Sequence, residues 1–336
     1  MGLNGTQWEG MGFKGRAKGT RCIALSHWLP LAPIASHCLA CFPLPACPSS
    51  HMPRLADMKL TPFLLFLAAI TCANAAPLKI NGSTTVNLPV AEAAEILRAE
   101  RHLDIQVDTQ GGSSGGISML AEGSVQMGMS SKPVSAEDQE KYPQCRFHSI
   151  HIGEDAVALI VSKDVWDNGV RALTKAQLKD LYEGRVTNWQ QLGGAHSQRI
   201  AFFNKEPGRG TWEVFVHWLY GSPKNAPQVS FPEVGGNEET RGKVATTRGA
   251  ISQLSASWAD GKSVFALALV GEDGVAVQPS AENIASHKYP LSRPLFVLTN
   301  GEPTGDAKVM ADFLLSERGQ SLVEKHGYLP LNALVK

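Results

Sequence analysis

Four short loops of this sequence are rich in serine, threonine and glycine, residue types that suit the binding of an anion. They span residues 81–85, 111–116, 130–133 and 204–211, and the last also carries two cations. Hydroxyls and backbone N–H groups donate hydrogen bonds, and glycine lets the backbone approach a ligand closely. Hydrogen bonds to a charged ligand are roughly twice as strong as neutral ones. One such loop usually forms only a tight turn, whereas four at equivalent places predict an anion site.

Each of these loops follows an apolar run and precedes a helical pattern or a turn. Expected strands lie at residues 78–80, 105–107, 125–129 and 200–203, and expected helices at about 89–101, 117–120 and 212–219. In open α/β sheets, ligands bind beyond the carboxyl ends of the strands. Helix N-termini at that edge offer free N–H groups and a positive dipole end to an anion.

The alternation of strands and helices predicts an α/β fold with a mostly parallel sheet. Residues 156–161 form a continuous apolar run that suits a buried strand. A second apolar run follows at 264–269, and a final helix is expected at about 306–326. With 336 residues, the chain is long enough for two domains that each bury a core.

The charge of the whole chain is balanced, with 31 basic and 31 acidic residues. Residues 1–75 hold six of the basic and two of the acidic residues, so the remainder, with 25 and 29, is slightly acidic. Proteins that bind nucleic acid usually carry a basic face. The composition therefore argues against nucleic acid as a partner, and an anion site has to be built from local groups.

Residues 58–75 have the pattern of a cleavable secretory signal peptide. Lys59 supplies the positive charge that a signal peptide carries at its start. Residues 62–70 are apolar, and residues 73–75 match the A-x-A cleavage signal. The apolar stretch is shorter than the about 20 residues that a membrane span needs. We expect the exported chain to begin at Ala76, and residues 1–57 to be an upstream extension that is non-native or disordered. Only Cys145 of the six cysteines follows the cleavage site, so no intramolecular disulfide is expected.

The loops together resemble the periplasmic phosphate-binding proteins of phosphate ABC importers, which are type II periplasmic binding proteins. The likeness covers about residues 78–332, and its motifs lie at residues 82–86, 112–117, 128–133, 184–189, 208–211 and 289–295. The resemblance implies a two-lobed α/β fold, each lobe a mostly parallel sheet flanked by helices, with the ligand in the cleft between them. It implies that residues 76–155 and 265–336 form lobe 1 and residues 156–264 form lobe 2.

The resemblance also implies a set of phosphate contacts. They are Ser83, Thr84, Ser113, Ser114 and Ser131 from lobe 1, and Lys205, Arg209, Gly210 and Thr211 from lobe 2. Each serine or threonine has an alternative role, which is to cap its own helix.

Four places depart from the family pattern, and one of them is the segment 249–253, where Ser252 and Gln253 replace a more usual Gly-Tyr. Lys205 stands where an arginine is frequent and Arg209 where a serine is, so either can be the main cationic contact. Ser131 occupies a position where some members have an aspartate that accepts the proton of hydrogen phosphate and excludes sulfate. A serine hydroxyl both donates and accepts, so the discrimination against sulfate is open.

The function implied is high-affinity phosphate binding as the periplasmic solute-binding component of an ABC importer. We expect a monomer with a permease partner, no cofactor, no metal and no enzymatic activity. The alternatives are the same fold binding sulfate, molybdate, tungstate or arsenate, or an exported anion-binding protein without a transporter. An exported phosphatase-like enzyme needs a nucleophile with a base, or a metal cluster. The histidines after residue 75 are scattered, and His148 and His151 are expected on opposite faces of a strand.

Overall fold

The computed structural model describes residues 76–334. The expected signal peptide and the upstream extension lie outside these residues. Within them, the chain forms two lobes on one mixed sheet whose strand order is β2-β1-β3-β12-β4-β8-β6-β7, with β9 paired to β4. Lobe 1 comprises residues 76–155 and 292–334, and lobe 2 comprises residues 156–291.

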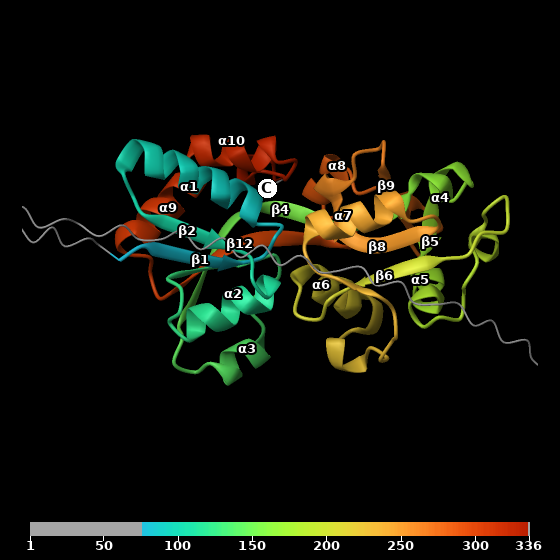
Figure 1. Ribbon diagram of the computed structural model, residues 1–336, viewed down its shortest axis with the longest axis horizontal. Coiled ribbons are helices and arrows are strands. Elements are labelled where there is room, and N and C mark those ends of the chain that lie inside the picture. The colour runs from blue at the N-terminus through green and yellow to red at the C-terminus, as the bar shows by residue number, and fades with distance from the viewer. Residues whose placement is uncertain (1–75, 335–336) are drawn as a thin grey trace, which may run out of the picture. The chain divides into compact units, whose positions relative to one another are not determined.

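Lobe 1 contains parallel strands β1, β2 and β3, with β12 antiparallel beside β3. Its elements are β1 (Leu78–Gly82), α1 (Asn87–Arg101), β2 (Ile105–Asp108), α2 (Gly112–Ala121), β3 (Met127–Ser130), α3 (Ala136–Lys141), β12 (Ser292–Asn300), α9 (Gly305–Leu315), α10 (Glu317–Lys325) and η5 (Leu331–Ala333). Helices α1, α9 and α10 cover one face of these strands and α2 covers the other (Figure 1), so each face has its own apolar cluster.

Lobe 2 places β6 in parallel between β7 and β8, and carries a second small sheet of order β11-β10-β5. Its core combines aliphatic with aromatic side chains and includes the buried Trp189, Phe202 and Phe215. Its elements are α4 (Lys163–Asp167), β5 (Ala172–Thr174), α5 (Lys175–Tyr182), η2 (Trp189–Leu192), β6 (Ala201–Lys205), α6 (Gly210–Tyr220), η3 (Pro223–Asn225), β7 (Glu233–Val234), α7 (Asn237–Thr246), β8 (Ala250–Ser255), η4 (Ala256–Trp258), β9 (Val264–Ala266), β10 (Ala268–Val270), β11 (Ala276–Val277) and α8 (Ala281–Ala285).

One long strand, β4 (Phe147–Ser162), connects the two lobes. Its first part pairs with β12 in lobe 1, and residues 157–161 pair with β8 in lobe 2. Figure 1 shows β4 and β12 running side by side where the lobes meet. Residues 152–162 are all buried, which explains why the run 156–161 is apolar without alternation.

The second crossing lies at a different place from the one expected near residue 265. Leu267, Leu269 and Tyr289 pack in the core of lobe 2, and the chain returns to lobe 1 only along β12. The apolar run 264–269 is also not one strand, because β9 pairs with β4 whereas β10 pairs with β5. An apolar run shows that a segment is buried, but it does not show which strand lies beside it.

The expected final helix at 306–326 is two helices, α9 and α10. Ser316 interrupts them with an extended backbone (φ −68°, ψ 162°), and its side chain accepts a hydrogen bond from the N–H of Gly319. Serine competes for backbone hydrogen bonds in this way, which makes it a frequent helix N-cap. No helix among residues 76–334 is both long and apolar enough to cross a bilayer.

Candidate anion site

A small cavity with ≈ 200 Å³ of empty space lies where β1, β3 and β6 end. Its lining residues come from both lobes and are Ser83, Thr84, Thr85, Gly112, Ser113, Ser131, Lys205, Arg209, Gly210, Thr211 and Asn237. None of them is acidic, and most are hydroxyl residues or glycines. The four loops singled out in the sequence thus meet at one place.

Eight of the nine residues expected as contacts line this cavity, and Ser114 does not. The Ser114 hydroxyl instead donates a hydrogen bond of 3.0 Å to Oε1 of Glu213 on α6. The resemblance to the phosphate-binding proteins implied a ligand contact for Ser114 as well as for Ser113. Successive residues in a helix point about 100° apart, so neighbours in sequence do not share a direction.

Four helices begin at the cavity, and none of them is capped by a side chain. The N-cap residues of α1, α2, α6 and α7 make no side-chain hydrogen bond to their helix. Away from the cavity, Ser135, Thr174, Ser280 and Ser316 cap helices, whereas α4 and α9 also lack a side-chain cap. The first turn of a helix leaves N–H groups without an intrahelical partner. The hydroxyls of the cavity are therefore not used for capping, and uncapped helix ends surround it.

The hydroxyls of lobe 1 form a connected group. Strands β1 and β3 are neighbours in register, with Gly82 beside Met129, so the loops that follow them adjoin. The Ser83 hydroxyl donates to Ser131 Oγ at 3.0 Å, and the N–H of Ser131 donates to Ser113 Oγ at 3.1 Å. All three side chains are buried, so their orientation is set by one another.

Gly210 lets lobe 2 approach this group. A Cβ atom at that position would lie 2.6 Å from both Ser113 Oγ and Ser131 Oγ, well inside the closest approach of real Cβ atoms. Glycine is thus the only residue that fits between the two hydroxyls without displacing them.

Among residues 76–334, Lys205 is a buried cation that forms no ion pair with a carboxylate. Its side chain is only 1% exposed, and Nζ lies within 3.4 Å of four neutral acceptors, the carbonyl oxygens of Gly235 and Gly236 and the side chains of Asn237 and Thr240. Burial, followed by the charges of Arg209 and Arg293, lowers the pKa of Lys205 to about 7. A negative ligand in the cavity would relieve this uncompensated positive charge.

Arg209 lines the same cavity, but its charge is already paired. Its Nη2 and Nε lie 2.8 Å and 3.0 Å from Oε2 of Glu206, three residues earlier in the same loop. The side chain is also partly exposed. Of the two cations that the sequence left open, only Lys205 lacks an acidic partner among residues 76–334.

Arg293 is a site residue that sequence reasoning missed. It is 1% exposed, and its Nη1 donates to Ser131 Oγ at 3.3 Å in lobe 1 and to Thr211 Oγ1 at 3.0 Å in lobe 2. Its Nη2 donates to Thr85 Oγ1 at 3.3 Å. Arg293 therefore holds cavity hydroxyls of both lobes in place from behind the lining.

Asp155 keeps Arg293 in this position. The Arg293 Nη2 and Nε lie 2.7 Å and 3.1 Å from Asp155 Oδ2, and the two residues are direct partners across β12 and β4. Oδ1 of Asp155 accepts a hydrogen bond from the Ser255 hydroxyl at 2.9 Å. Arg293 lies in the motif at residues 289–295, and Asp155 directly precedes the apolar run 156–161. These two charged residues were the signal in the sequence that could have revealed the pair.

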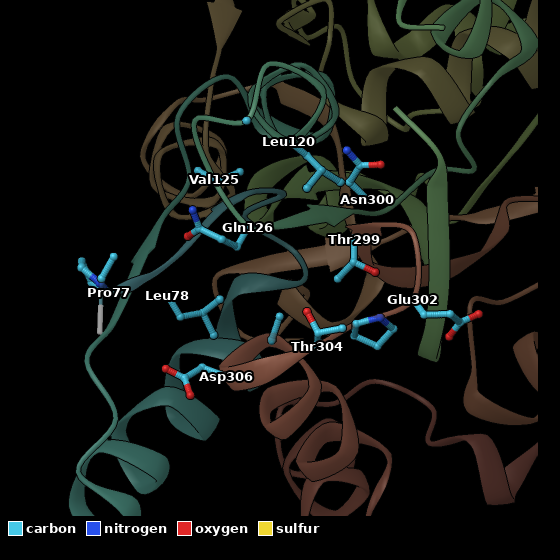
Figure 2. A pocket seen from close by; sticks show the side chains of 14 residues that line it. Pro77, Leu78, Leu120, Val125, Gln126, Thr299, Asn300, Glu302, Thr304 and Asp306 are labelled. Carbon is cyan, nitrogen blue, oxygen red and sulfur yellow. The ribbon is translucent and has the colours of Figure 1, made fainter. Parts of the chain in front are cut away.

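A larger pocket near the start of β1 is poorly suited to an anion. Figure 2 shows its lining, which includes Glu302 and Asp306 and contains no lysine or arginine. Its empty space is ≈ 980 Å³, against ≈ 200 Å³ for the small cavity. Among residues 76–334, no group of three or more His, Cys, Asp and Glu side chains is placed to hold a metal ion.

Comparison with known proteins places the chain beside phosphate binders. Residues 68–318 match the family model of the PBP superfamily domain. The chain is 33% identical over 256 residues to the phosphate-binding protein PstS of Bacillus subtilis. This alignment covers 76% of this chain and 80% of that protein.

Solved structures agree with this comparison. A candidate phosphate ABC transporter substrate-binding protein from Clostridium perfringens, with bound phosphate, superposes with a TM-score of 0.67 at 30% identity. The match covers 76% of this chain and 100% of the other. An ABC-type phosphate transport receptor from Vibrio cholerae superposes with a TM-score of 0.60 at 28% identity, over 75% and 99% of the two chains. The two-lobed α/β fold expected from the sequence is confirmed.

Proposed function

The chain belongs to the PBP superfamily, in the family of the phosphate-binding proteins, and from this premise we propose that it binds phosphate as the solute-binding component of an ABC importer. The proposed contacts are the hydroxyls of Ser83, Thr84, Ser113, Ser131 and Thr211, the N–H groups of the helix ends around them, and the charge of Lys205. Arg293 positions the hydroxyls of Ser131 and Thr211 from behind the lining. Phosphate has many acceptor lone pairs, and this set of donors is suited to satisfy them.

The observation that carries the proposal is the charge of Lys205. A buried ammonium that faces only neutral acceptors is costly, and proteins usually pair such groups. The cavity beside it offers donors and no carboxylate, so a small anion supplies the missing charge. Because the lining comes from both lobes, such an anion binds fully only when the lobes are closed over it.

Sulfate is a second candidate, because no carboxylate lines the cavity. At neutral pH phosphate still carries a proton, whereas sulfate carries none. A carboxylate on the lining would accept that proton and repel sulfate, but here only hydroxyl oxygens can accept it.

Isothermal titration of the protein from Ala76 onward with phosphate, sulfate and molybdate tests the function. We expect saturable phosphate binding with a 1:1 stoichiometry, and weaker binding of the other two ions. Tighter binding of sulfate than of phosphate would replace the proposed ligand, and no binding of any oxyanion would refute the site.

The extracytoplasmic location is part of the proposal and depends on the expected cleavage before Ala76. N-terminal sequencing of the exported protein is expected to begin at Ala76 or at a neighbouring residue. Co-purification with a membrane permease would support the importer role, and exported material that still carries residues 1–57 would contradict the assignment of the signal peptide.

Exchange of Lys205 for methionine is expected to weaken phosphate binding far more than exchange of Arg209 for alanine. Lys205→Met removes the unpaired cation. We expect it to reduce the free energy of phosphate binding by about 2–4 kcal/mol, which raises the Kd about 30- to 1000-fold. Arg209→Ala removes a charge that Glu206 already neutralises, so we expect it to reduce the free energy of phosphate binding by less than about 1 kcal/mol. Titration of both variants, with circular dichroism as the test of folding, measures the difference. The reverse order would make Arg209 the main cationic contact.

Phosphate affinity is expected to depend on pH through Lys205, whose pKa in the free protein lies at about 7. The bound anion raises this pKa, so the contribution of Lys205 to affinity is complete below pH 7 and is lost as the pH rises above it. The loss can reach about tenfold per pH unit, until the pH passes the pKa of the bound state.

A Lys205→Arg variant provides the reference, because arginine stays charged throughout this range. The ionisation of phosphate itself affects both proteins equally, so the ratio of their dissociation constants isolates Lys205. We expect the Kd of the wild type divided by the Kd of Lys205→Arg to increase from about pH 7 to about pH 9, because only the wild type loses its charge. A ratio that stays constant over that range would show that the charge of Lys205 does not contribute to binding.

A further inference from the structure

The two lobes are joined beside the segments that line the cavity by an acidic residue that does not line it itself. Glu213, on α6 of lobe 2, accepts a hydrogen bond from the Ser114 hydroxyl on Oε1 at 3.0 Å. Its Oε2 forms an ion pair of 2.7 Å with Nζ of Lys132. Ser114 and Lys132 both belong to lobe 1, so each carboxylate oxygen of Glu213 has a partner across the cleft.

The three residues adjoin the proposed phosphate contacts in sequence. Ser114 follows Ser113, Lys132 follows Ser131, and Glu213 lies two positions after Thr211. A further bond joins the lobes here, since the N–H of Ser114 donates to the carbonyl oxygen of Gly208 at 3.1 Å. The segments that carry Ser113, Ser131 and Thr211 are thus also bonded to one another through residues that do not line the cavity.

From this geometry we propose that Glu213 is a positioning residue that holds the lobes closed and thereby slows ligand release. The proposal rests on the proposed function, because it assigns a role in phosphate binding to a residue outside the cavity. Breaking both contacts of Glu213 removes two of the bonds that join lobe 1 to α6 and makes the closed state less favourable. The bond from Ser114 to Gly208 and those of Arg293 remain.

The surroundings of the Lys132–Glu213 ion pair strengthen it in the closed state and allow it to break when the lobes separate. The side chains of Lys132 and Glu213 are only 8% and 22% exposed, so their attraction is screened less than that of a surface pair. Lys132 also lies 3.3 Å from Asp138 of its own lobe. When the lobes separate, Lys132 keeps this partner and Glu213 becomes hydrated, so opening leaves no buried charge unpaired.

A second ion pair across the cleft provides a matched control. Lys224 of lobe 2 pairs with Glu137 of lobe 1 at 2.7 Å, but their side chains are 72% and 66% exposed. Exposed pairs contribute little to stability. Glu137→Ala therefore removes an acidic residue and an ion pair between the lobes without affecting the Glu213 group.

The test is stopped-flow measurement of phosphate association and dissociation, followed by tryptophan fluorescence, because Trp212 adjoins Thr211 at the site. We expect Glu213→Ala to raise the dissociation rate about tenfold and to change the association rate by less than about twofold, whereas Glu137→Ala changes both by less than about twofold. Glu213→Gln retains acceptor capacity but loses the charge, so its dissociation rate is expected to lie between those of the wild type and Glu213→Ala.

The variants Lys132→Ala and Lys132→Ala/Glu213→Ala complete a double-mutant cycle. If the two residues act together, the double variant dissociates at about the rate of Glu213→Ala, whereas independent effects would multiply. A wild-type dissociation rate in folded Glu213→Ala overturns the inference while phosphate binding stands. Failure of the wild-type protein to bind phosphate would instead refute the proposed function itself.

Discussion

Replacement of Arg293 by methionine is expected to abolish high-affinity phosphate binding and to destabilise the protein by about 3–5 kcal/mol, because removing one partner of a buried ion pair leaves the other uncompensated. Asp155 would then be buried without a cation, and Thr85, Ser131 and Thr211 would each lose a donor. Thermal unfolding measures the loss of stability, and titration with phosphate measures the loss of binding.

A double variant separates the two effects. In Asp155→Leu/Arg293→Met both charges are gone, and apolar replacement of a whole buried pair is often neutral or stabilising. We expect the double variant to recover most of the stability but none of the phosphate affinity. Recovery of binding together with stability would mean that phosphate binding does not need the hydrogen bonds of Arg293 to Ser131 and Thr211.

Exchange of Gly210 for alanine is expected to weaken phosphate binding strongly while leaving the fold intact. The new Cβ would lie 2.6 Å from the hydroxyl oxygens of Ser113 and Ser131, so these residues must move or the lobes must separate. Overpacking of this kind costs about 1–3 kcal/mol, or roughly 5- to 150-fold in Kd. Gly210 is the first residue of α6 and does not have a positive φ, so alanine suits its backbone.

Gly242→Ala is the matched control for this variant. Gly242 lies inside α7, and a Cβ there would meet nothing within 4 Å. Glycine-to-alanine exchanges at compatible positions stabilise proteins by about 0.4–1 kcal/mol, so Gly242→Ala is expected to raise the melting temperature and to bind like the wild type. If Gly210→Ala also binds like the wild type, the cavity between Ser113 and Ser131 is not the anion site.

Much of the fold and most of the site could be predicted from local sequence patterns. The apolar runs and helical periods located β1, α1, β2, β3, β6 and α6 to within a few residues, because these patterns reflect which face of each element is buried. The loops after β1, β2 and β3 meet because the carboxyl ends of neighbouring parallel strands share one edge of a sheet. The loop after β6 joins them from lobe 2, where three strands of the sheet separate β6 from β3. For this reason eight of the nine expected residues line one cavity.

Other properties of the site depend on contacts between residues that are far apart in the sequence. Arg293 and Asp155 are 138 positions apart, and only the pairing of β12 with β4 brings their side chains together. Glu206 pairs with Arg209, whereas the carbonyl groups around Lys205 belong to a segment about 30 residues further on. The sequence alone therefore left open which of the two cations lacks an acidic partner.

The same limit explains the expectations that differ from the structure. Ser114 adjoins a lining residue, but the rotation of α2 directs its hydroxyl to Glu213. The run 264–269 is apolar, but its partners β4 and β5 place it in lobe 2 rather than at the crossing. Hydrophobic periodicity records burial, which is a property of single residues. Pairing of charges, strand neighbours and side-chain direction are properties of two residues at once, and only the packed chain brings such pairs within reach.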